Sequence, residues 1–278
     1  MIPDGPGVEL ERHLIPAPGV DLACWRRAGD GAERTVVWLH GAGGNHLMWH
    51  RQFDAFPGVD QLFLDVRGQG ESSMHAGERA SFEAAVDDIG LVLDASGIER
   101  AVLVGHSWGG NPAQEFAFRH PERVDGLVLV GTWGQHRRMS TGERRTIAAM
   151  SQLYRIVPWR ALAAYSGKWA SDDPTTRAAV AASIRATGRQ VYLDLGTSAY
   201  AAVHEVDDYP AETPTLLIRG ERDAAKALDP IYADIVAKNP AARTVVIAET
   251  GHQPMLDTPE RFNAIVADFL DQLTRSDG

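Results

Sequence analysis

The chain of 278 residues is 44% hydrophobic, 8% aromatic and 23% charged, which is enough apolar material for one large domain or two small ones. Its 27 basic and 37 acidic residues give a net charge of −10, the wrong sign for non-specific binding to nucleic acid. No run of about 18 uncharged apolar residues occurs, so we expect no membrane-spanning helix. Residues 1–10 lack the basic start and apolar stretch of a secretory signal, and the single cysteine, Cys24, cannot form an internal disulfide. We therefore expect a cytoplasmic protein.

Short apolar runs alternate with helical patterns in the first half of the chain, as a mostly parallel sheet covered by helices requires. Near-continuous apolar runs are typical of strands that are buried on both faces. Residues 81–96 predict an amphipathic helix with Ser81 as its N-cap, and a last helix is expected over residues 259–273. The strands are predicted at residues 34–40, 61–65, 101–105, 124–131, 214–220 and 243–248.

The alternation of strands and helices stops over residues 134–208. This segment has alanine-rich helical stretches with interspersed aromatic residues and no convincing buried strand. A structureless loop of that length inside a compact domain would be unusual. We therefore predict an α/β core formed by residues 1–133 and 209–278, with a helical cap over residues 134–208.

A serine between glycines follows the third predicted strand, in the segment Gly105-His-Ser-Trp-Gly109. The chain must turn sharply there from strand to helix, which leaves Ser107 in a strained conformation with an exposed hydroxyl. The N–H groups at the start of the following helix point toward negative charge that develops beside it. The strand before and the helix after make Ser107 a candidate nucleophile, whereas the spacing alone would indicate only a glycine-lined turn.

A serine nucleophile needs a base, and the base needs a carboxylate that holds its tautomer. His252 stands directly after the last predicted strand, where a loop can reach the carboxyl end of the sheet. Asp223 follows the strand at residues 214–220 and supplies a carboxylate, with Glu221 as the competing acid. The order Ser107, Asp223, His252 matches the order of nucleophile, acid and base that accompanies this type of turn.

The oxyanion that forms on attack needs backbone donors. We expect one N–H from Trp108, directly after the nucleophile, and a second from the glycine-rich loop after the first predicted strand. Ala42 is the expected donor of this loop, with Gly43 as the alternative. The loop lacks the Lys-Ser/Thr ending of a phosphate-binding loop.

These motifs resemble those of the α/β-hydrolase family, occur in the same order as in that family and span about residues 20–275. They include the His40-Gly41 loop followed by Trp49, the segment at residues 65–72, the serine turn, the turn at residues 220–223 and the Gly251-His252 loop. The resemblance implies a mostly parallel, eight-stranded sheet with helices on both faces and a helical cap inserted after strand 6. The family's haloalkane dehalogenases and epoxide hydrolases carry an aspartate nucleophile where this chain has Ser107. Trp108 stands where many relatives have a smaller aliphatic residue.

The expected activity is that of a serine hydrolase, which cleaves a carboxylic ester or lactone of a medium-sized, partly apolar molecule through an acyl-enzyme on Ser107. Hydrolysis of a carbon–carbon bond in a ketone, perhydrolase chemistry and a non-catalytic ligand receptor remain alternatives, because all of them are compatible with the same scaffold. A small molecule is the expected partner, and a homodimer stays open. The substrate contacts are expected from Gly41, Gly43, Trp133, Tyr154 and Trp159.

Three histidines follow the first predicted strand closely enough to suggest a metal site. No carboxylate completes a ligand set at metal spacing there, so neither a metal nor a cofactor is expected. These histidines are His40, His46 and His50.

Overall fold

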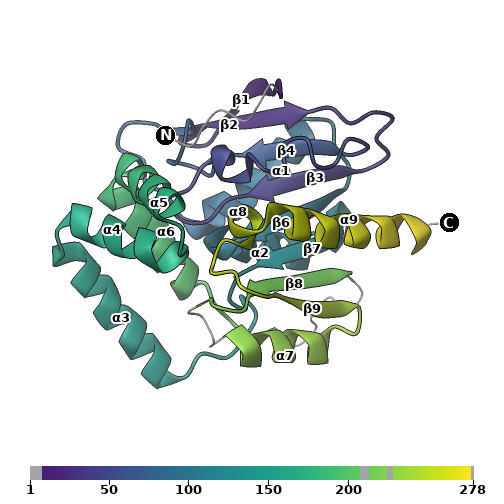
Figure 1. Cartoon of the computed structure of the whole chain (residues 1–278). Coiled ribbons are helices and arrows are strands. Elements are labelled where there is room, and N and C mark those ends of the chain that lie inside the picture. The colour runs from purple at the N-terminus through teal and green to yellow at the C-terminus, as the bar shows by residue number, and fades with distance from the viewer. Residues whose placement is uncertain (1–7, 207–212, 224–227, 277–278) are drawn as a thin grey trace.

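The computed structural model describes residues 8–206, 213–223 and 228–276 of the chain (Figure 1). One mixed sheet runs through these residues in the order β1-β2-β4-β3-β6-β7-β8-β9. The six strands from β4 to β9 along this order are parallel, and β1 and β2 join them as an antiparallel edge. The strands are β1 Glu11–Ala17, β2 Val20–Arg27, β3 Thr35–Leu39, β4 Asp60–Leu64, β5 Ser73–Met74, β6 Ala101–His106, β7 Val124–Val130, β8 Thr215–Gly220 and β9 Ala242–Ile247.

The described part of the sheet has nine strands rather than the eight expected. The additional strand is β5, which has only two residues and pairs with β2 beside the main path. Two residues carry no hydrophobic periodicity, so the pattern gave no sign of this strand. The six predicted apolar runs all coincide with parallel strands.

The β1–β2 hairpin was not predicted from the hydrophobic pattern. Strand β1 carries charged and exposed residues and contains Pro16, so it lacks a continuous apolar run. Its connection to β2 is the dipeptide Pro18-Gly19, and Gly19 has φ +75°. Proline followed by glycine is a turn signal that could have located the hairpin.

Helices cover both faces of the sheet, because alternate residues of a strand point to opposite sides. On β3, Val37 and Leu39 join the core beneath one set of helices, while Val36 and Trp38 join the core on the other side. The first core is covered by α1 Phe82–Ala95, α2 Gly110–Arg119 and α7 Leu228–Lys238. The second is covered by α9 Pro259–Ser276, with the short helices η1 His46–Trp49 and α8 Pro254–Asp257 beside it.

The described residues between β7 and β8 form four helices, and we refer to these as the four-helix insertion. They are α3 Thr141–Ile156, α4 Trp159–Ala170, α5 Pro174–Thr187 and α6 Arg189–Ala201. Figure 1 shows them together at one end of the sheet. The insertion follows the sixth strand of the chain when the two-residue β5 is not counted. Its expected end at residue 208 lies outside the described residues.

Two helices of the insertion, α3 and α5, begin at side-chain caps. Ser140 and Glu143 form a capping box at the start of α3, in which each side chain bonds to the other residue's backbone N–H. Asp173 caps α5, whose first residue is Pro174. Gly188, with φ +81°, separates α5 from α6. Local sequence therefore accounts for where α3 and α5 start.

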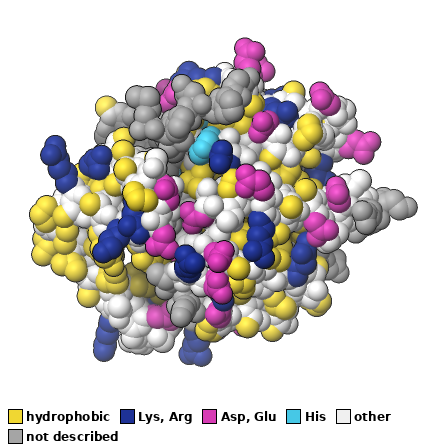
Figure 2. Space-filling model, in the orientation of Figure 1, with side chains coloured by type: hydrophobic (Ala, Val, Ile, Leu, Met, Phe, Trp, Pro, Cys, Tyr) yellow, Lys and Arg dark blue, Asp and Glu magenta, His cyan; other side chains and the backbone are white. Residues whose placement is uncertain are grey.

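The outer surface of the insertion carries exposed apolar side chains. Leu153 and Ile156 of α3 are 50% and 79% exposed, and Tyr165 of α4 is 62% exposed. In Figure 2, hydrophobic side chains gather at the left edge of the molecule, where Figure 1 places α3 and α4. Within the described ranges, no helix is both long and apolar enough to cross a membrane.

Candidate active site

Ser107 occupies the sharp turn between β6 and α2. Its φ of +51° lies in the left-handed region, which a residue with a side chain rarely adopts. Glycine is required on either side: a Cβ on Gly105 would lie 2.4 Å from Cα of Gly110, and a Cβ on Gly109 would lie 2.4 Å from the carbonyl oxygen of Leu39. The close packing of strand β3, strand β6 and helix α2 thus holds the serine in its strained conformation.

Asp223 and His252 meet at the carboxyl ends of β8 and β9. The Nδ1 atom of His252 lies 2.9 Å from Oδ2 of Asp223, and both side chains are almost fully buried. Gly131, at the end of β7, makes room for them, because a Cβ there would lie 2.9 Å from the His252 ring. The competing acid, Glu221, is exposed and accepts a hydrogen bond from the backbone N–H of Glu249 instead. The hydrogen bond to Asp223 leaves Nε2 of His252 as the nitrogen available to a substrate or a nucleophile.

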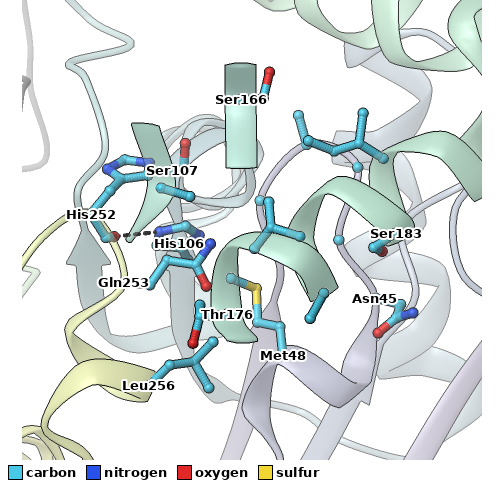
Figure 3. A pocket seen from close by; sticks show the side chains of 18 of the residues that line it. Asn45, Met48, His106, Ser107, Ser166, Thr176, Ser183, His252, Gln253 and Leu256 are labelled. Carbon is cyan, nitrogen blue, oxygen red and sulfur yellow. Dashed lines mark hydrogen bonds between the residues drawn. The ribbon is translucent and has the colours of Figure 1, made fainter. Parts of the chain in front are cut away.

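His106, next to the serine, supports the loop that carries His252. Its Nε2–H donates to the carbonyl oxygen of His252 over 2.9 Å, a bond drawn as a dashed line in Figure 3. Burial, together with the smaller effect of the neighbouring His252, lowers the pKa of His106 to about 3. A neutral His106 therefore holds the backbone of residue 252 while the His252 ring remains free to act.

The glycine-rich loop after β3 lies beside Ser107, since a Cβ on Gly41 would lie 3.3 Å from Cβ of Ser107. The N–H of Gly43 donates to the side-chain oxygen of Gln69, and the N–H of Gly44 donates to the carbonyl oxygen of Gly41 over 2.9 Å. Within the described residues, the N–H of Ala42 has no hydrogen-bond acceptor. The N–H of Trp108 belongs to the first turn after the serine, where helical N–H groups have no partner within the helix. This arrangement favours Ala42 over Gly43 as the second oxyanion donor.

Two cavities meet at Ser107. The first, of about 380 Å³, lies between the glycine-rich loop, the α8 region and α5, and Gly41, Gly43 and His252 line it. Figure 3 shows Ser107, His252 and Ser166 at one side of this cavity, with Asn45 and Ser183 at the other. The second cavity, of about 400 Å³, lies beneath α3, α4 and α6. It is rich in aromatic side chains: Trp108, Trp133, Tyr154, Tyr165, Trp169, Tyr192 and Tyr200.

Three residues of the insertion lie close to the reacting groups and were not singled out from the sequence. Ser166, Trp169 and Tyr192 line both cavities. The indole of Trp169 packs on the ring of His252. Their residue types alone gave no signal, because aromatic residues in a helical insertion more commonly form its own small core.

The expected substrate-contact residues fall into two groups. Gly41 and Gly43 line the first cavity, and Trp133 and Tyr154 line the second. Trp159 lines neither cavity: its ring packs edge-on against Tyr192, with a centroid separation of 5.5 Å. Trp159 thus reaches the cavities only through Tyr192.

Trp108 ties the serine turn to the insertion. Its indole N–H donates to the carbonyl oxygen of Leu195 on α6 over 3.0 Å, and its ring packs edge-on against Phe82 of α1. The side chain is 1% exposed and forms part of the second cavity's wall. A large residue at this position therefore bridges core and insertion in addition to narrowing the cavity.

The histidines after β3 serve separate partners. His40 donates from Nδ1 to the carbonyl oxygen of Gly41 and accepts the N–H of Val66 at Nε2, and burial lowers its pKa. His46 contacts the buried carboxylate of Asp65, and its ring stacks on Trp25 at 4.2 Å. These contacts hold the loop in place.

The chain matches the sequence model of one protein family and is similar to several enzymes. A sequence model of the alpha/beta hydrolase fold matches residues 34–259. A 2-hydroxy-6-oxononadienedioate/2-hydroxy-6-oxononatrienedioate hydrolase of Paraburkholderia phymatum is 32% identical over 270 residues, which cover 91% of this chain and 93% of that one. A 2-hydroxymuconate semialdehyde hydrolase of Pseudomonas sp. strain CF600 is 32% identical over 257 residues, 86% of this chain and 88% of that one. Among solved structures, an esterase of Thermogutta terrifontis superposes with a TM-score of 0.80 at 23% identity, covering 95% and 99% of the two chains.

Proposed function

Because the chain belongs to the α/β-hydrolase family and is a hydrolase of that fold, we propose that it cleaves a carboxylic ester or lactone through an acyl-enzyme on Ser107. The observation that carries the proposal is the hydrogen-bonded pair of Asp223 and His252 beside the cavity that contains the strained Ser107. A strained nucleophile, a base and a carboxylate that orients the base are the parts that acyl transfer to serine requires.

In the proposed reaction, Oγ of Ser107 attacks the ester carbonyl carbon while Nε2 of His252 takes the hydroxyl proton. Asp223 accepts the hydrogen bond from Nδ1–H and stabilises the imidazolium that results. The N–H groups of Ala42 and Trp108 bind the oxyanion. His252 then protonates the departing alcohol oxygen. In the second half, Nε2 of His252 takes a proton from water, the hydroxide attacks the acyl carbon, and the same proton passes to Oγ of Ser107 as the acid departs.

The cavities support a partly apolar substrate of medium size. The second cavity places aromatic rings from α3, α4 and α6 near Ser107, so we assign to it the apolar part of the substrate. The first cavity combines polar side chains such as Thr176 and Ser183 with apolar ones such as Ile184, and we assign the remaining part of the substrate to it. A substrate that spans both would place its ester carbonyl at Ser107.

Carbon–carbon bond hydrolysis is the second candidate, and the relatives favour it. Two relatives that share 32% identity over most of their length are named as a 2-hydroxy-6-oxononadienedioate/2-hydroxy-6-oxononatrienedioate hydrolase and a 2-hydroxymuconate semialdehyde hydrolase. Cleavage of a carbon–carbon bond leaves negative charge on a carbon atom of the leaving group. That carbon must be protonated, whereas an ester requires a proton on its departing oxygen. The arrangement of Ser107, Asp223 and His252 is compatible with both reactions.

The experiment compares turnover of aryl esters, lactones and 2-hydroxy-6-oxo-dienoates by the wild-type protein and three variants. We expect ester or lactone turnover to exceed turnover of the dienoates. Ser107→Ala and Asp223→Asn should each lower kcat by about 10⁴-fold. The control Ser73→Ala, which removes an exposed hydroxyl on β5, should keep wild-type turnover. Ester turnover that survives in Ser107→Ala refutes the proposal, and preferential turnover of the dienoates establishes the second candidate instead.

A further inference from the structure

Two histidines and a glutamate from distant parts of the chain come together at the base of the four-helix insertion. Glu115 lies on α2, His136 follows β7, and His204 follows α6. His136 and His204 form a parallel β-bridge, and the N–H of His204 donates to the carbonyl oxygen of Gln135 over 3.3 Å. The two chain segments that enter and leave the insertion are therefore paired beside α2 of the core.

The side chains of this cluster converge on one point. Nε2 of His136 lies 2.9 Å from Oε2 of Glu115, and these two side chains are only 1% and 3% exposed. One potential ligand atom from each of the three residues lies within 4.8 Å of those of the other two. The cluster lines neither of the cavities that contain Ser107. Its chemistry is thus separate from that of the candidate active site.

Neighbouring groups already orient two of the three side chains. Nε of Arg119 donates to Oε1 of Glu115 over 2.8 Å, which leaves Oε2 directed toward the histidines. Nδ1–H of His204 donates to the carbonyl oxygen of Ala202 over 2.9 Å, so its Nε2 carries the lone pair. Metal-binding histidines commonly have their second nitrogen fixed in this way. The ring of Phe118 packs against both imidazoles and provides an apolar wall.

We propose that Glu115, His136 and His204 bind one divalent transition-metal ion, of which Zn²⁺ is the representative. Two imidazoles and one carboxylate form a known zinc ligand set, completed by water. Ligand atoms around a tetrahedral zinc with bonds of about 2.0 Å lie about 3.3 Å apart, so the 2.9 Å pair of His136 and Glu115 must open slightly and His204 must come closer. His204 is its most solvent-facing member and can approach by rotation of its side chain. The proton between His136 and Glu115 passes to solvent when the ion binds.

The expected consequence is structural. The ion would join both ends of the insertion to helix α2 of the core. The two ends are already paired with each other by the β-bridge between His136 and His204. A ligand that binds only the folded protein stabilises it. The proposal does not depend on the reaction at Ser107, and its test uses binding and stability rather than turnover.

The experiment titrates chelator-treated protein with ZnCl₂ by calorimetry and follows thermal unfolding with and without the ion. We expect one zinc per chain and a Tm that rises with zinc concentration. His204→Ala and Glu115→Gln should weaken zinc binding at least tenfold, a loss typical of removing a group from a metal site. The control His120→Ala removes an exposed histidine at the end of α2 and should bind zinc like the wild type.

Co²⁺ supplies a second readout, because its visible absorption reports coordination by nitrogen and oxygen ligands. Wild-type protein should develop this absorption with one equivalent of Co²⁺, and His204→Ala should not. His204 faces solvent, so this variant should fold, as circular dichroism would verify. The absence of stoichiometric binding in the wild type overturns the proposal, as does zinc affinity in both variants equal to that of the wild type.

Discussion

The indole ring of Trp169 lies 4.2 Å from the imidazole ring of His252, centroid to centroid, with their planes inclined by 53°. Trp169 belongs to α4 of the insertion, whereas His252 follows the last strand of the core. The insertion therefore contacts the proposed base directly, in addition to covering the cavities. The imidazolium that forms when His252 takes a proton would lie beside the electron-rich face of an indole, which favours the cation.

Truncation of Trp169 should therefore slow the reaction itself. Trp169→Ala should lower kcat by about two- to thirtyfold, because cation–π contacts contribute about 0.5–1 kcal/mol at exposed sites and about 2 kcal/mol when they are desolvated. Trp169→Phe, which keeps an aromatic face, should lose less. Steady-state kinetics with an aryl ester measures the effect, and Ile156→Ala, a truncation of an exposed residue of α3 outside both cavities, is the matched control. An unchanged kcat in Trp169→Ala would show that the ring contact plays no part in the reaction.

Acid should destabilise the protein through His106. Its pKa of about 3 in the folded protein is below the usual 6.5, so the unfolded chain binds a proton first as the pH falls. The contribution of neutral His106 to the free energy of unfolding is complete above about pH 6.5 and decreases as the pH falls toward 3. At pH 5 the loss is about 2 kcal/mol for this one residue. The buried His40, whose pKa is also lowered, contributes with the same sign.

Substitution of His106 should reduce this pH dependence. Urea unfolding at pH 7 and pH 5 gives the difference in free energy of unfolding, which should be smaller by about 2 kcal/mol in His106→Gln than in the wild type. His75→Gln, which alters an exposed histidine, should keep the wild-type difference. Comparing differences removes any uniform loss of stability that the substitution causes. Equal differences in wild type and His106→Gln would mean that His106 does not hold a depressed pKa.

The serine turn should not tolerate a methyl group on Gly109. A Cβ at this position would lie 2.4 Å from the carbonyl oxygen of Leu39 and 2.5 Å from that of His40, and backbone atoms cannot move aside cheaply. Gly109→Ala should therefore lower the free energy of unfolding by about 1–3 kcal/mol. Gly196→Ala is the matched substitution within α6, where a Cβ meets open space, and should stabilise the helix by roughly 0.5–1 kcal/mol. Denaturant unfolding of both variants measures the contrast, and equal effects would contradict this account of the turn.

The sequence predicts those parts of the fold whose signals are local. The parallel strands are continuous apolar runs, such as residues 101–105 within β6, and Ser81 caps α1 through its bond to the N–H of Ala84. The left-handed conformation of Ser107 could also be predicted locally. The glycines on either side of it indicate a turn too tight to accommodate side chains at those positions. The β1–β2 hairpin could not be predicted from the hydrophobic pattern, because half of β1 faces solvent and Pro16 interrupts its apolar residues.

Contacts between distant segments could not be predicted in the same way. Nothing in the residues around Trp169 indicates that α4 turns it toward His252 rather than into the insertion's own core. The choice of Asp223 over Glu221 depends on how the turn after β8 orients side chains two residues apart. The cluster of His136, His204 and Glu115 depends on a β-bridge between segments that 67 intervening residues separate. Such arrangements arise from tertiary packing, which one sequence does not display.

The nucleophilic role of Ser107 is the central claim, and covalent labelling tests it most directly. Wild-type protein is treated with a fluorophosphonate, and the adduct is located by intact-mass and peptide mass spectrometry. The account predicts a single adduct on Ser107, no adduct in Ser107→Ala, and labelling slowed by at least about 10³-fold in His252→Ala. An adduct on any other residue, or a wild-type protein that the fluorophosphonate does not label, would contradict it.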